Sequence, residues 1–565
     1  MTTQTCQITG QQFQVSDFEK ELLQKISPSI NKQVFELPLP NINPEERLRH
    51  RLAFYNRRHL YKRTSDYSGQ TIISVFSPDK PFKAYETRTW YSDDFDPIQY
   101  GQPYDFTRPF FQQFYELLVR TPQNALATLG DNINSEFTND NYKLKNCYLV
   151  FDGEEGEDCY YGQNFARIKN CIDFMFLVDC ELCYECLHCV NCYDLKFSSF
   201  SQNCSSSYFL QDCIGCKHCF GCINLRNKEY CIYNKQYTKE EYENFISNSN
   251  LGSYKQLQFY KQEIQKFFLT QPRKENRNVN VQNVTGDNLT NCKNIFECYD
   301  CLNLEESLYC MNMLTGGHTC LDVFSWGNNI QNAYNCAIIG DNLNQIICSS
   351  LIGINCSNIF YSSWCTRNCH NLFGCFGLKQ KSYCILNKQY IKEEFEEIVP
   401  KIIQQMQQDQ TWGTFFPPEI SPFGYNESLA QERMPLSKEE VLNKKWKWCD
   451  FKSEIQANQT LNPENLPDHI QDINPSIIND AILCPKSNIP FKITAQELKF
   501  YQQQNLPLPR LHHEERYKQL LAKTNPWHLY NRACAKSGNP ILTPYSPDRP
   551  EIVYSEQAYN ELVYG

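Results

Sequence analysis

The sequence lacks both a surplus of positive charge and any long apolar run. Its 565 residues include 54 Lys and Arg against 64 Asp and Glu, a formal net charge of −10. Proteins that bind nucleic acid usually carry a basic face, so this balance disfavours chain-wide binding of polyanions. No run of about 18 apolar residues occurs, which disfavours a membrane span. The opening MTTQTCQITGQQF also lacks the basic and apolar regions of a signal peptide, so we expect a cytoplasmic protein.

The linear motifs of common enzyme classes are missing as well. The sequence contains no GxxxxGK[ST], no HExxH and no GxSxG, which are typical of nucleotide-binding proteins, metalloproteases and hydrolases. Carbohydrate-active enzymes built on parallel β-helices leave little linear signature, and the acids of Asp152–Asp158 are candidates for such a site. A solvated turn explains this acidic segment better. We therefore favour a non-enzymatic protein and keep that enzyme class as an alternative.

Cysteine is present in excess, at 30 positions. A long chain without an export signal favours reduced thiols or metal ligands over disulfides. From Cys147 to Cys231, every cysteine falls in one register of three residues. Neither a helix nor a strand keeps residues three apart on one face, so the register predicts short strands separated by corners.

Asn or Asp precedes many of these cysteines, as is typical of turn positions. Successive starts at such positions are 24, 21 and 21 residues apart, which we interpret as the coils of a right-handed parallel β-helix. Cysteines at equivalent corners would then stack as small buried hydrophobes. The alternative is a cluster site, because Cys180–Cys192 contains C-x2-C-x2-C, although the proline of ferredoxin loops is missing.

Two internal duplications define the organisation of the chain. Leu37–Tyr85 aligns with Leu506–Tyr554 at a constant offset of 469, and the segment at Cys6 matches that at Cys484. A second pair, from Cys219 and from Leu372, is offset by 153 residues. Each copy of this second pair ends in a strand and then a helix that begins near Lys239 or Lys392 with acidic residues in its first turn. We expect these helices to cap two repeated blocks.

The predicted fold is mainly β with α: a right-handed parallel β-helix (solenoid) in two duplicated blocks, flanked by homologous α+β modules. The predicted segments are an N-terminal module (1–90), a helical connector (91–140), block 1 (141–237), capping helices and a linker (238–290), block 2 (291–390), a helix and extended connector (391–480) and a C-terminal module (481–565).

The sequence resembles a family of uncharacterised proteins from small-genome bacteria. The likeness covers most of the chain and rests on TGQxF, LYKR, IIS-SPDKP, YGxxxDFxRPFFxQF, NKQYxKEEY, SPFGYNE and YSPDRPEIVY. It implies zinc-ribbon-like ends around a cysteine-rich repeat core, and no activity. Tetrahedral zinc needs four ligands, but several of the ligand positions that the family implies hold Ser, Thr, Asn or Ala here. One residual set at the C-terminal module remains for zinc: Cys484, His512, Glu515 and Cys534. We expect no cofactor beyond that possible ion.

The N-terminal module carries a basic segment, residues 47–63, interleaved with aromatic residues. Basic and aromatic side chains together suit contacts to phosphates and bases. The candidate residues are Arg47, Arg49, Arg51, Arg57, Arg58, Lys62 and Arg63. A solvated helix face paired with nearby acids is the simpler interpretation. The favoured function is thus an intracellular binding or scaffold protein that engages an unidentified protein or polymer through an extended solenoid surface, with a nucleic-acid- or ribosome-associated factor as an alternative.

Overall fold

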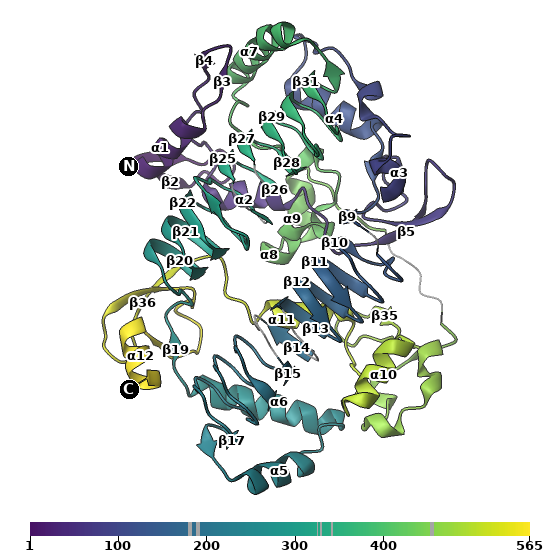
Figure 1. Ribbon diagram of the computed structural model, residues 1–565, viewed down its shortest axis with the longest axis vertical. Coiled ribbons are helices and arrows are strands. Elements are labelled where there is room, and N and C mark those ends of the chain that lie inside the picture. The colour runs from purple at the N-terminus through teal and green to yellow at the C-terminus, as the bar shows by residue number, and fades with distance from the viewer. Residues whose placement is uncertain are drawn as a thin grey trace. The chain divides into compact units, whose positions relative to one another are not determined.

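The computed structural model describes residues 1–130, 132–178, 184–187, 193–324, 326–327, 330–340, 343–451 and 457–564. The chain is a mixed α/β protein with extensive parallel sheet (Figure 1). It divides into two compact units. Unit 1 contains residues 1–126, 276–451 and 527–529, and unit 2 contains residues 127–275, 452–526 and 530–565. The N-terminal module therefore belongs with block 2, and the C-terminal module belongs with block 1.

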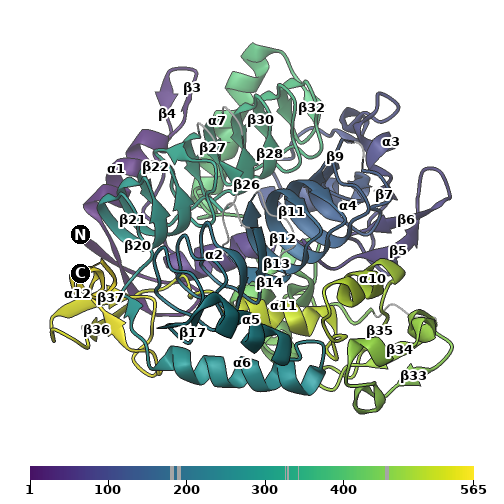
Figure 2. The ribbon, with the colours of Figure 1, turned by 60° about the horizontal axis from the view of Figure 1, so that its bottom comes forward.

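Unit 2 is organised around an eight-stranded parallel sheet with the order β16-β15-β14-β13-β12-β11-β10-β9, whose stacked strands are visible in Figures 1 and 2. Its strands are β9 (Thr128–Leu129), β10 (Asn139–Tyr142), β11 (Tyr148–Glu157), β12 (Tyr160–Lys169), β13 (Ile172–Val178), β14 (Tyr184–Leu187), β15 (Tyr193–Lys196) and β16 (Ser205–Tyr208). The hairpin β17 (Cys231–Ile232) and β18 (Lys235–Gln236) leads to α5 (Lys239–Asn248) and α6 (Tyr254–Leu269). The predicted helix start at Lys239 is confirmed.

The remaining elements of unit 2 belong mostly to the C-terminal module. They are β19 (Arg273–Lys274), β33 (Thr460–Leu461), β34 (Ala481–Leu483), β35 (Pro490–Phe491), α10 (Ala495–Gln503), α11 (His513–Leu521), β36 (Tyr530–Ala533), β37 (Pro540–Thr543), β38 (Val553–Tyr554) and α12 (Glu556–Tyr564). Helices α10 and α11 supply the residues that this module places against block 1, since α11 contacts β12, β13 and β14.

The parallel strands of unit 2 repeat every 12 residues. Tyr148 pairs with Tyr160, Tyr160 with Ile172, and Ile172 with Tyr184. The predicted step of 21 to 24 residues is therefore wrong. Left-handed backbone conformations recur every third residue, with φ between 50° and 57° at Asn146, Leu149, Asp152, Glu155, Asp158, Tyr161, Asn164, Arg167 and Asn170. Each of them turns the chain, so short straight pieces are separated by corners, as the cysteine register predicts. Of the segment Cys180–Cys192, only residues 184–187 lie within the described part of the chain.

Cysteine and serine occupy equivalent inward positions and make the same bonds. The Sγ of Cys219 donates to the carbonyl of Lys217, two residues earlier (3.2 Å). Twelve residues before Cys219, the Oγ of Ser207 donates to the carbonyl of Ser205 (2.7 Å) and accepts the N–H of Cys219 (3.0 Å). Every described cysteine is a free thiol, and all but Cys449 are buried. The thiols thus act as small buried hydrogen-bond donors in the interior of the repeats.

Asparagine supports the corners. Asn134, Asn146 and Asp158 all have left-handed backbones, which asparagine and aspartate tolerate better than most residues. The amide of Asn134 donates to Asn146 (3.0 Å), and that of Asn146 donates to Asp158 (3.0 Å). In unit 1, Asn291 donates in the same way to Asn303, twelve residues later (3.2 Å). The predicted turn role of the Asn and Asp residues is confirmed at these corners.

Unit 1 begins with the N-terminal module and its connector. Their elements are β1 (Thr2–Thr5), β2 (Gln12–Val15), α1 (Asp17–Ile26), β3 (Ser29–Ile30), β4 (Gln33–Val34), α2 (Pro44–Leu52), β5 (Tyr61–Thr64), β6 (Thr71–Ser74), β7 (Ala84–Tyr85), α3 (Thr87–Tyr91), α4 (Phe110–Arg120) and β8 (Gln123–Asn124). The pairs β1–β2 and β5–β6 are antiparallel hairpins, as is β36–β37 of unit 2.

The second part of unit 1 is a stack of parallel strands. They are β20 (Gln282–Thr290), β21 (Lys293–Leu302), β22 (Leu304–Leu308), β23 (Gly317–His318), β24 (Trp326–Gly327), β25 (Gln331–Tyr334), β26 (Ala337–Gly340), β27 (Asn344–Ile347), β28 (Ser350–Gly353), β29 (Ser357–Phe360), β30 (His370–Phe373), β31 (Ser382–Ile385) and the antiparallel β32 (Lys388–Gln389). Helices α7 (Lys392–Gln408), α8 (Leu429–Arg433) and α9 (Lys438–Asn443) follow. The predicted helix start at Lys392 is confirmed, and α7 contacts β31.

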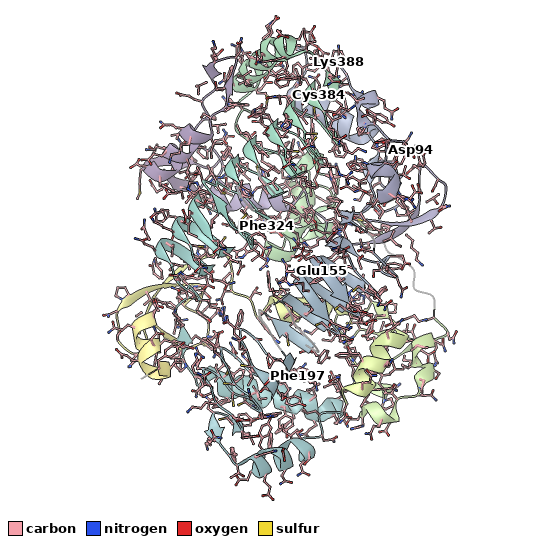
Figure 3. The ribbon with its side chains drawn as sticks, viewed as in Figure 1. Asp94, Glu155, Phe197, Phe324, Cys384 and Lys388 are labelled. Carbon is pink, nitrogen blue, oxygen red and sulfur yellow. The ribbon has the colours of Figure 1, made fainter. Side chains whose placement is uncertain are left out.

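The repeat in unit 1 is less regular than in unit 2. Gln282 pairs with Lys293 at a step of 11, Ser357 pairs with His370 at a step of 13, and His370 pairs with Ser382 at a step of 12. The interior is still filled by cysteine and aliphatic side chains, and Cys384 on β31 is labelled in Figure 3. None of the helices within the described ranges is long and apolar enough to span a membrane.

Candidate functional site: a pocket beside a buried ion cluster

The basic segment of the N-terminal module is largely buried. The exposed fractions are 3% for Arg47, 9% for Arg49, 0% for Arg51, 3% for Arg57 and 5% for Arg58. Lys62 is exposed, and Arg63 is half-buried with its Nη2 bonded to Asp66 (3.0 Å). These five arginines are therefore buried, unlike in either a phosphate-binding patch or a solvated helix face. Arg47, Arg49 and Arg51 lie on α2, where their guanidinium groups donate to protein acceptors, and Arg57 and Arg58 follow that helix.

Arg47 is the centre of a buried ion cluster in unit 1. Its Nη2 donates to Glu19 Oε1 of α1 (2.9 Å), and its Nε lies 2.6 Å from Asp322 Oδ2 of block 2. Arg51 Nη1 lies 3.5 Å from Asp322 Oδ1, and the guanidinium of Arg47 stacks over Tyr309 at 5.2 Å. Burial alone would lower the pKa of Arg47, but the two carboxylates outweigh it and raise that pKa. The module is thus joined to block 2 by charge pairs that water does not reach.

Unit 2 contains a second cluster of the same construction. Arg516 Nη1 of α11 lies 3.1 Å from Asp173 Oδ2 of β13 and 3.7 Å from Glu497 Oε1 of α10. The guanidinium stacks over Tyr161 at 4.7 Å, and the Tyr161 hydroxyl donates to Glu497 (2.9 Å). Tyr501 accepts a further bond from Arg516 Nη1 (3.1 Å). Burial raises the pKa of Asp173 to about 7 although Arg516 lies beside it.

The two clusters follow from the duplication of the end modules. Arg47 and Arg516 are aligned residues of the repeat at offset 469. Glu19 and Glu497 each stand three residues after the N-cap of their helix, and in both helices the cap side chain accepts the N–H of that glutamate. Sequence reasoning missed these clusters because it considered the arginines as a surface feature. The sequence Glu-Glu-Arg that the two end modules share, at residues 45–47 and 514–516, was the available signal.

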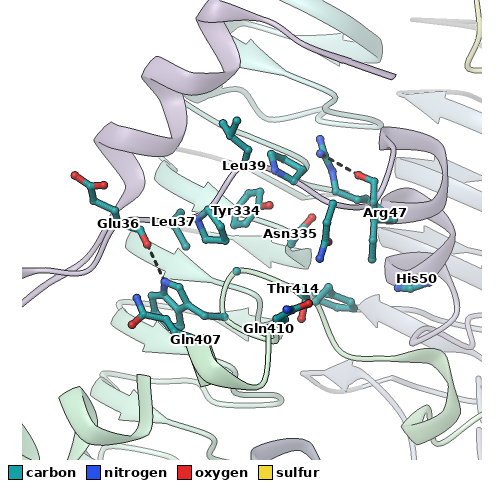
Figure 4. A pocket seen from close by; sticks show the side chains of 17 residues that line it. Glu36, Leu37, Leu39, Arg47, His50, Tyr334, Asn335, Gln407, Gln410 and Thr414 are labelled. Carbon is teal, nitrogen blue, oxygen red and sulfur yellow. Dashed lines mark hydrogen bonds between the residues drawn. The ribbon is translucent and has the colours of Figure 1, made fainter. Parts of the chain in front are cut away.

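A pocket with a volume of about 520 Å³ adjoins the cluster of unit 1. This lies within the range of roughly 300–1,000 Å³ that is usual for ligand sites. The pocket is lined by Glu36, Leu37, Pro38, Leu39, Pro40, Asn41, Ile42, Arg47, His50, Tyr334, Asn335, Gln407, Gln410, Trp412, Gly413, Thr414 and Phe415. Figure 4 shows Leu39 and Arg47 on one side, Gln410 and Thr414 on the other, and Tyr334 and Asn335 between them.

The charges around the pocket are compensated. Arg47 is held by two carboxylates, and burial beside Arg49 and Arg51 lowers the pKa of His50 to about 3, so this imidazole is neutral at physiological pH. The buried Nε2 of His50 finds no hydrogen-bond partner among the described residues. The carboxylate of Glu36 is exposed. The pocket therefore offers no strong attraction to an anion, and its lining does not bring an acid and a base together for catalysis.

The four candidate zinc ligands are each engaged elsewhere. His512 Nδ1 accepts the N–H of Glu514 (3.2 Å), and Glu515 bonds Lys518 (2.6 Å). Cys534 Sγ accepts the backbone N–H groups of Ser537 and Ser555, at 3.4 and 3.2 Å. Burial would raise the pKa of Cys484, but hydrogen bonds from Ser487 and the His512 backbone lower it. Within the described ranges, no three His, Cys, Asp or Glu side chains are grouped to hold a metal ion, so the structure does not bring the predicted ligands together.

The acidic segment Asp152–Asp158 lies mostly on β11, with left-handed corners at Asp152, Glu155 and Asp158. Its acids are paired with bases one repeat away. Glu157 lies 2.7 Å from Lys145 and 3.0 Å from Lys169, and Glu155, labelled in Figure 3, lies 3.5 Å from Lys143. This ladder of surface ion pairs accounts for those acids without a catalytic role.

Comparison with protein-family models, curated proteins and solved structures finds no match for the chain.

Proposed function

We propose that the chain is a non-enzymatic binding or scaffold protein built on two parallel β-solenoid blocks. The right-handed coil, the zinc-ribbon ancestry of the end modules and the membership of the resembled bacterial family belong to this proposal. The 12-residue pairing with a corner at every third residue supports the solenoid, because it stacks equivalent residues in rows. The free thiols of the described cysteines suit a reducing cytoplasm.

The observation that carries the proposal is how the chemically versatile side chains are used. Cysteine fills the interior, asparagine holds the corners, and buried arginine joins modules to blocks. The outer surface of the blocks and the compensated pocket of unit 1 stay available for a partner. Such surfaces are typical of repeat proteins that bind partners. The burial of the basic segment gives the nucleic-acid alternative no support, and the paired acids of β11 give the enzyme alternative none.

The test is photo-crosslinking in native extracts. A photoreactive residue at Glu155, on the ion-pair ladder, is expected to capture one discrete partner, whereas the same residue at the exposed Lys239 of helix α5 captures none. Equal labelling from both positions, or no adduct from the ladder, would speak against a scaffold that uses this surface.

A further inference from the structure

The pocket of unit 1 has a counterpart in unit 2. The segment Leu37–Pro40 forms one wall of the pocket, and its duplicate is Leu506–Pro509. The opposite wall is Trp412-Gly413-Thr414-Phe415, which follows α7. After the matching helix α5, unit 2 has Leu251-Gly252-Ser253-Tyr254, with glycine, a hydroxyl residue and an aromatic residue in the same order. Unit 2 therefore has a duplicate of the first wall and a segment of similar sequence in the place of the second.

In unit 2 this place is filled by the chain itself, with residues Leu466–Ile470. Tyr254 N–H donates to the carbonyl of Asp468 (2.8 Å), Ile470 N–H donates to the carbonyl of Gly252 (3.1 Å), and Ser253 pairs antiparallel with His469. The side chains of Leu466 and Ile470 are buried in the cluster that contains Leu506 and Leu508, as shown by exposed fractions of 7% and 1%. Arg510 Nη2 also donates to the carbonyl of Leu466 (3.2 Å). An extended peptide is thus bound by backbone pairing and two apolar anchors.

In unit 1 the equivalent surface is open. Leu39 is 36% exposed where its duplicate Leu508 is 4% exposed, and Pro38 is exposed where Pro507 is buried. Phe415 N–H and Gly413 C=O correspond to the groups of Tyr254 and Gly252 that pair with the covering segment. Neither has a hydrogen-bond partner within the described residues. An unpaired backbone edge beside exposed apolar residues is what strand addition uses.

We propose that the pocket of unit 1 binds an extended peptide of a partner protein, in the way that unit 2 binds its own Leu466–Ile470. The peptide carries two apolar anchors four residues apart and pairs with the backbone of Gly413–Phe415. Thr414, which donates to Thr411 (2.8 Å), corresponds to Ser253, which donates to the Asp468 carboxylate. This deepens the proposed binding function, on which it rests for the existence of a partner.

One residue of the pocket sets a preference. Glu36 occupies the place of Asn505. In unit 2, a Cβ added to Gly252 would meet both Asn505 Oδ1 (2.6 Å) and His469 Nε2 (2.4 Å), so these two side chains surround the same glycine. In unit 1, a Cβ added to Gly413 would instead meet Pro38 Cδ (2.9 Å) and Leu37 Cδ2 (3.7 Å), and Glu36 lines the pocket with its carboxylate exposed. A basic residue at the peptide position that corresponds to His469 is favoured because its charge pairs with the exposed carboxylate at the edge of the pocket.

The experiment is a titration of the full-length protein with two nine-residue peptides, followed by tryptophan fluorescence. All seven tryptophans of the sequence fall in unit 1, and Trp412 lines the pocket. The first peptide is residues 464–472, ENLPDHIQD, and the second has Lys in place of the histidine. We expect both to bind, the Lys peptide about 5- to 10-fold tighter, in line with roughly 1 kcal/mol for a partly exposed ion pair. Glu36→Gln removes that difference.

The matched variants are Leu39→Ser in the pocket wall and Val34→Ser, which is 58% exposed on β4 and does not line the pocket. Leu39→Ser is expected to weaken both peptides by about 10-fold, while Val34→Ser leaves them unchanged. Absence of binding at millimolar peptide, or equal affinity in the two variants, overturns the peptide site. Either result leaves the crosslinking test of the scaffold untouched, so the two proposals fail separately.

Discussion

The two buried ion clusters have the same plan but a different balance of charge. In unit 1, two arginines face two acids, because Arg51 lies beside Asp322. In unit 2, the residue aligned with Arg51 is Leu520, so Arg516 alone faces Asp173 and Glu497. In place of a second arginine, this cluster has two tyrosine hydroxyls. The hydroxyl of Tyr161 donates to Glu497, and that of Tyr501 accepts a hydrogen bond from Arg516. A duplicated module can therefore keep its docking arginine while the chemistry around it diverges.

The largest expected effect comes from removing the shared arginine. Arg516→Met leaves two buried carboxylates without their cation and is expected to cost about 3–5 kcal/mol of the stability of unit 2. Arg47→Met should cost about 1–2 kcal/mol less in unit 1, because Arg51 still lies 3.5 Å from Asp322. Urea unfolding measures both, with far-UV circular dichroism for the whole chain and tryptophan fluorescence for unit 1. Equal losses in the two variants would remove the asymmetry.

The acid excess of unit 2 predicts a dependence on pH. Burial raises the pKa of Asp173 from 3.8 to about 7, with Glu185 and Glu497 adding to the rise and Arg516 opposing it. Between about pH 4 and pH 7, the folded state holds a proton that the unfolded state releases, so the stability of unit 2 falls as the pH rises. The slope is at most about 1.4 kcal/mol per pH unit.

Asp173→Asn should flatten this slope, which is measured by urea unfolding from pH 4 to pH 8 with far-UV circular dichroism. The transition of unit 1, followed by tryptophan fluorescence, serves as the internal control and should not change. A variant with the same slope as the parent protein would show that Asp173 is ionised in the folded state across this range.

A smaller effect is expected when unit 1 is made more like unit 2. Arg51→Leu copies the residue found at Leu520 and leaves Arg47 with its bonds to Glu19 and Asp322. Arg51 is fully buried, and its Nε and Nη2 lack hydrogen-bond partners in the described part of the chain. The loss of one ion pair is thus offset by relief of a buried charge, and we expect a change within about 2 kcal/mol of either sign. A loss above that, in tryptophan-monitored unfolding, would mean that Arg51 is an essential partner of Asp322.

The smallest expected effect concerns cysteine. Cys219→Ser keeps the donor to the carbonyl of Lys217 and reproduces the arrangement that Ser207 already has one repeat earlier. We expect a loss of about 1 kcal/mol or less, whereas Cys219→Val, which has no donor, should cost more. Circular dichroism of urea unfolding checks the order. A serine variant that fails to fold would indicate that the thiol has a role that a hydroxyl does not fulfil.

The sequence predicted the local structure of the repeats well, for a physical reason. A corner at every third residue requires a residue that tolerates a left-handed backbone, and the interior beside it requires a small side chain. Asparagine meets the first requirement and cysteine meets the second, so Asn-Cys pairs at a fixed spacing indicate this structure. The length of one repeat was predicted wrongly, because the step of 24 residues from Cys147 to Cys171 passed over the equivalent start at Asp158 and Cys159.

The candidate site was less predictable than the fold. Arg47 and its neighbours are basic in sequence, and only tertiary packing shows that Glu19 and Asp322 bury them. The pocket depends on the exposure of Leu39, whose duplicate Leu508 is covered by a segment about 40 residues away in the chain. No local pattern distinguishes the open copy from the closed one.

The central claim is the crossed pairing, in which the N-terminal module docks on block 2 and the C-terminal module docks on block 1. Double-mutant cycles on the full chain test it most directly. Arg47→Met should couple with Asp322→Asn by about 1–3 kcal/mol and with Asp173→Asn by less than about 0.5 kcal/mol, and Arg516→Met should show the reverse pattern. Coupling of Arg47 to Asp173, or of Arg516 to Asp322, would contradict the account.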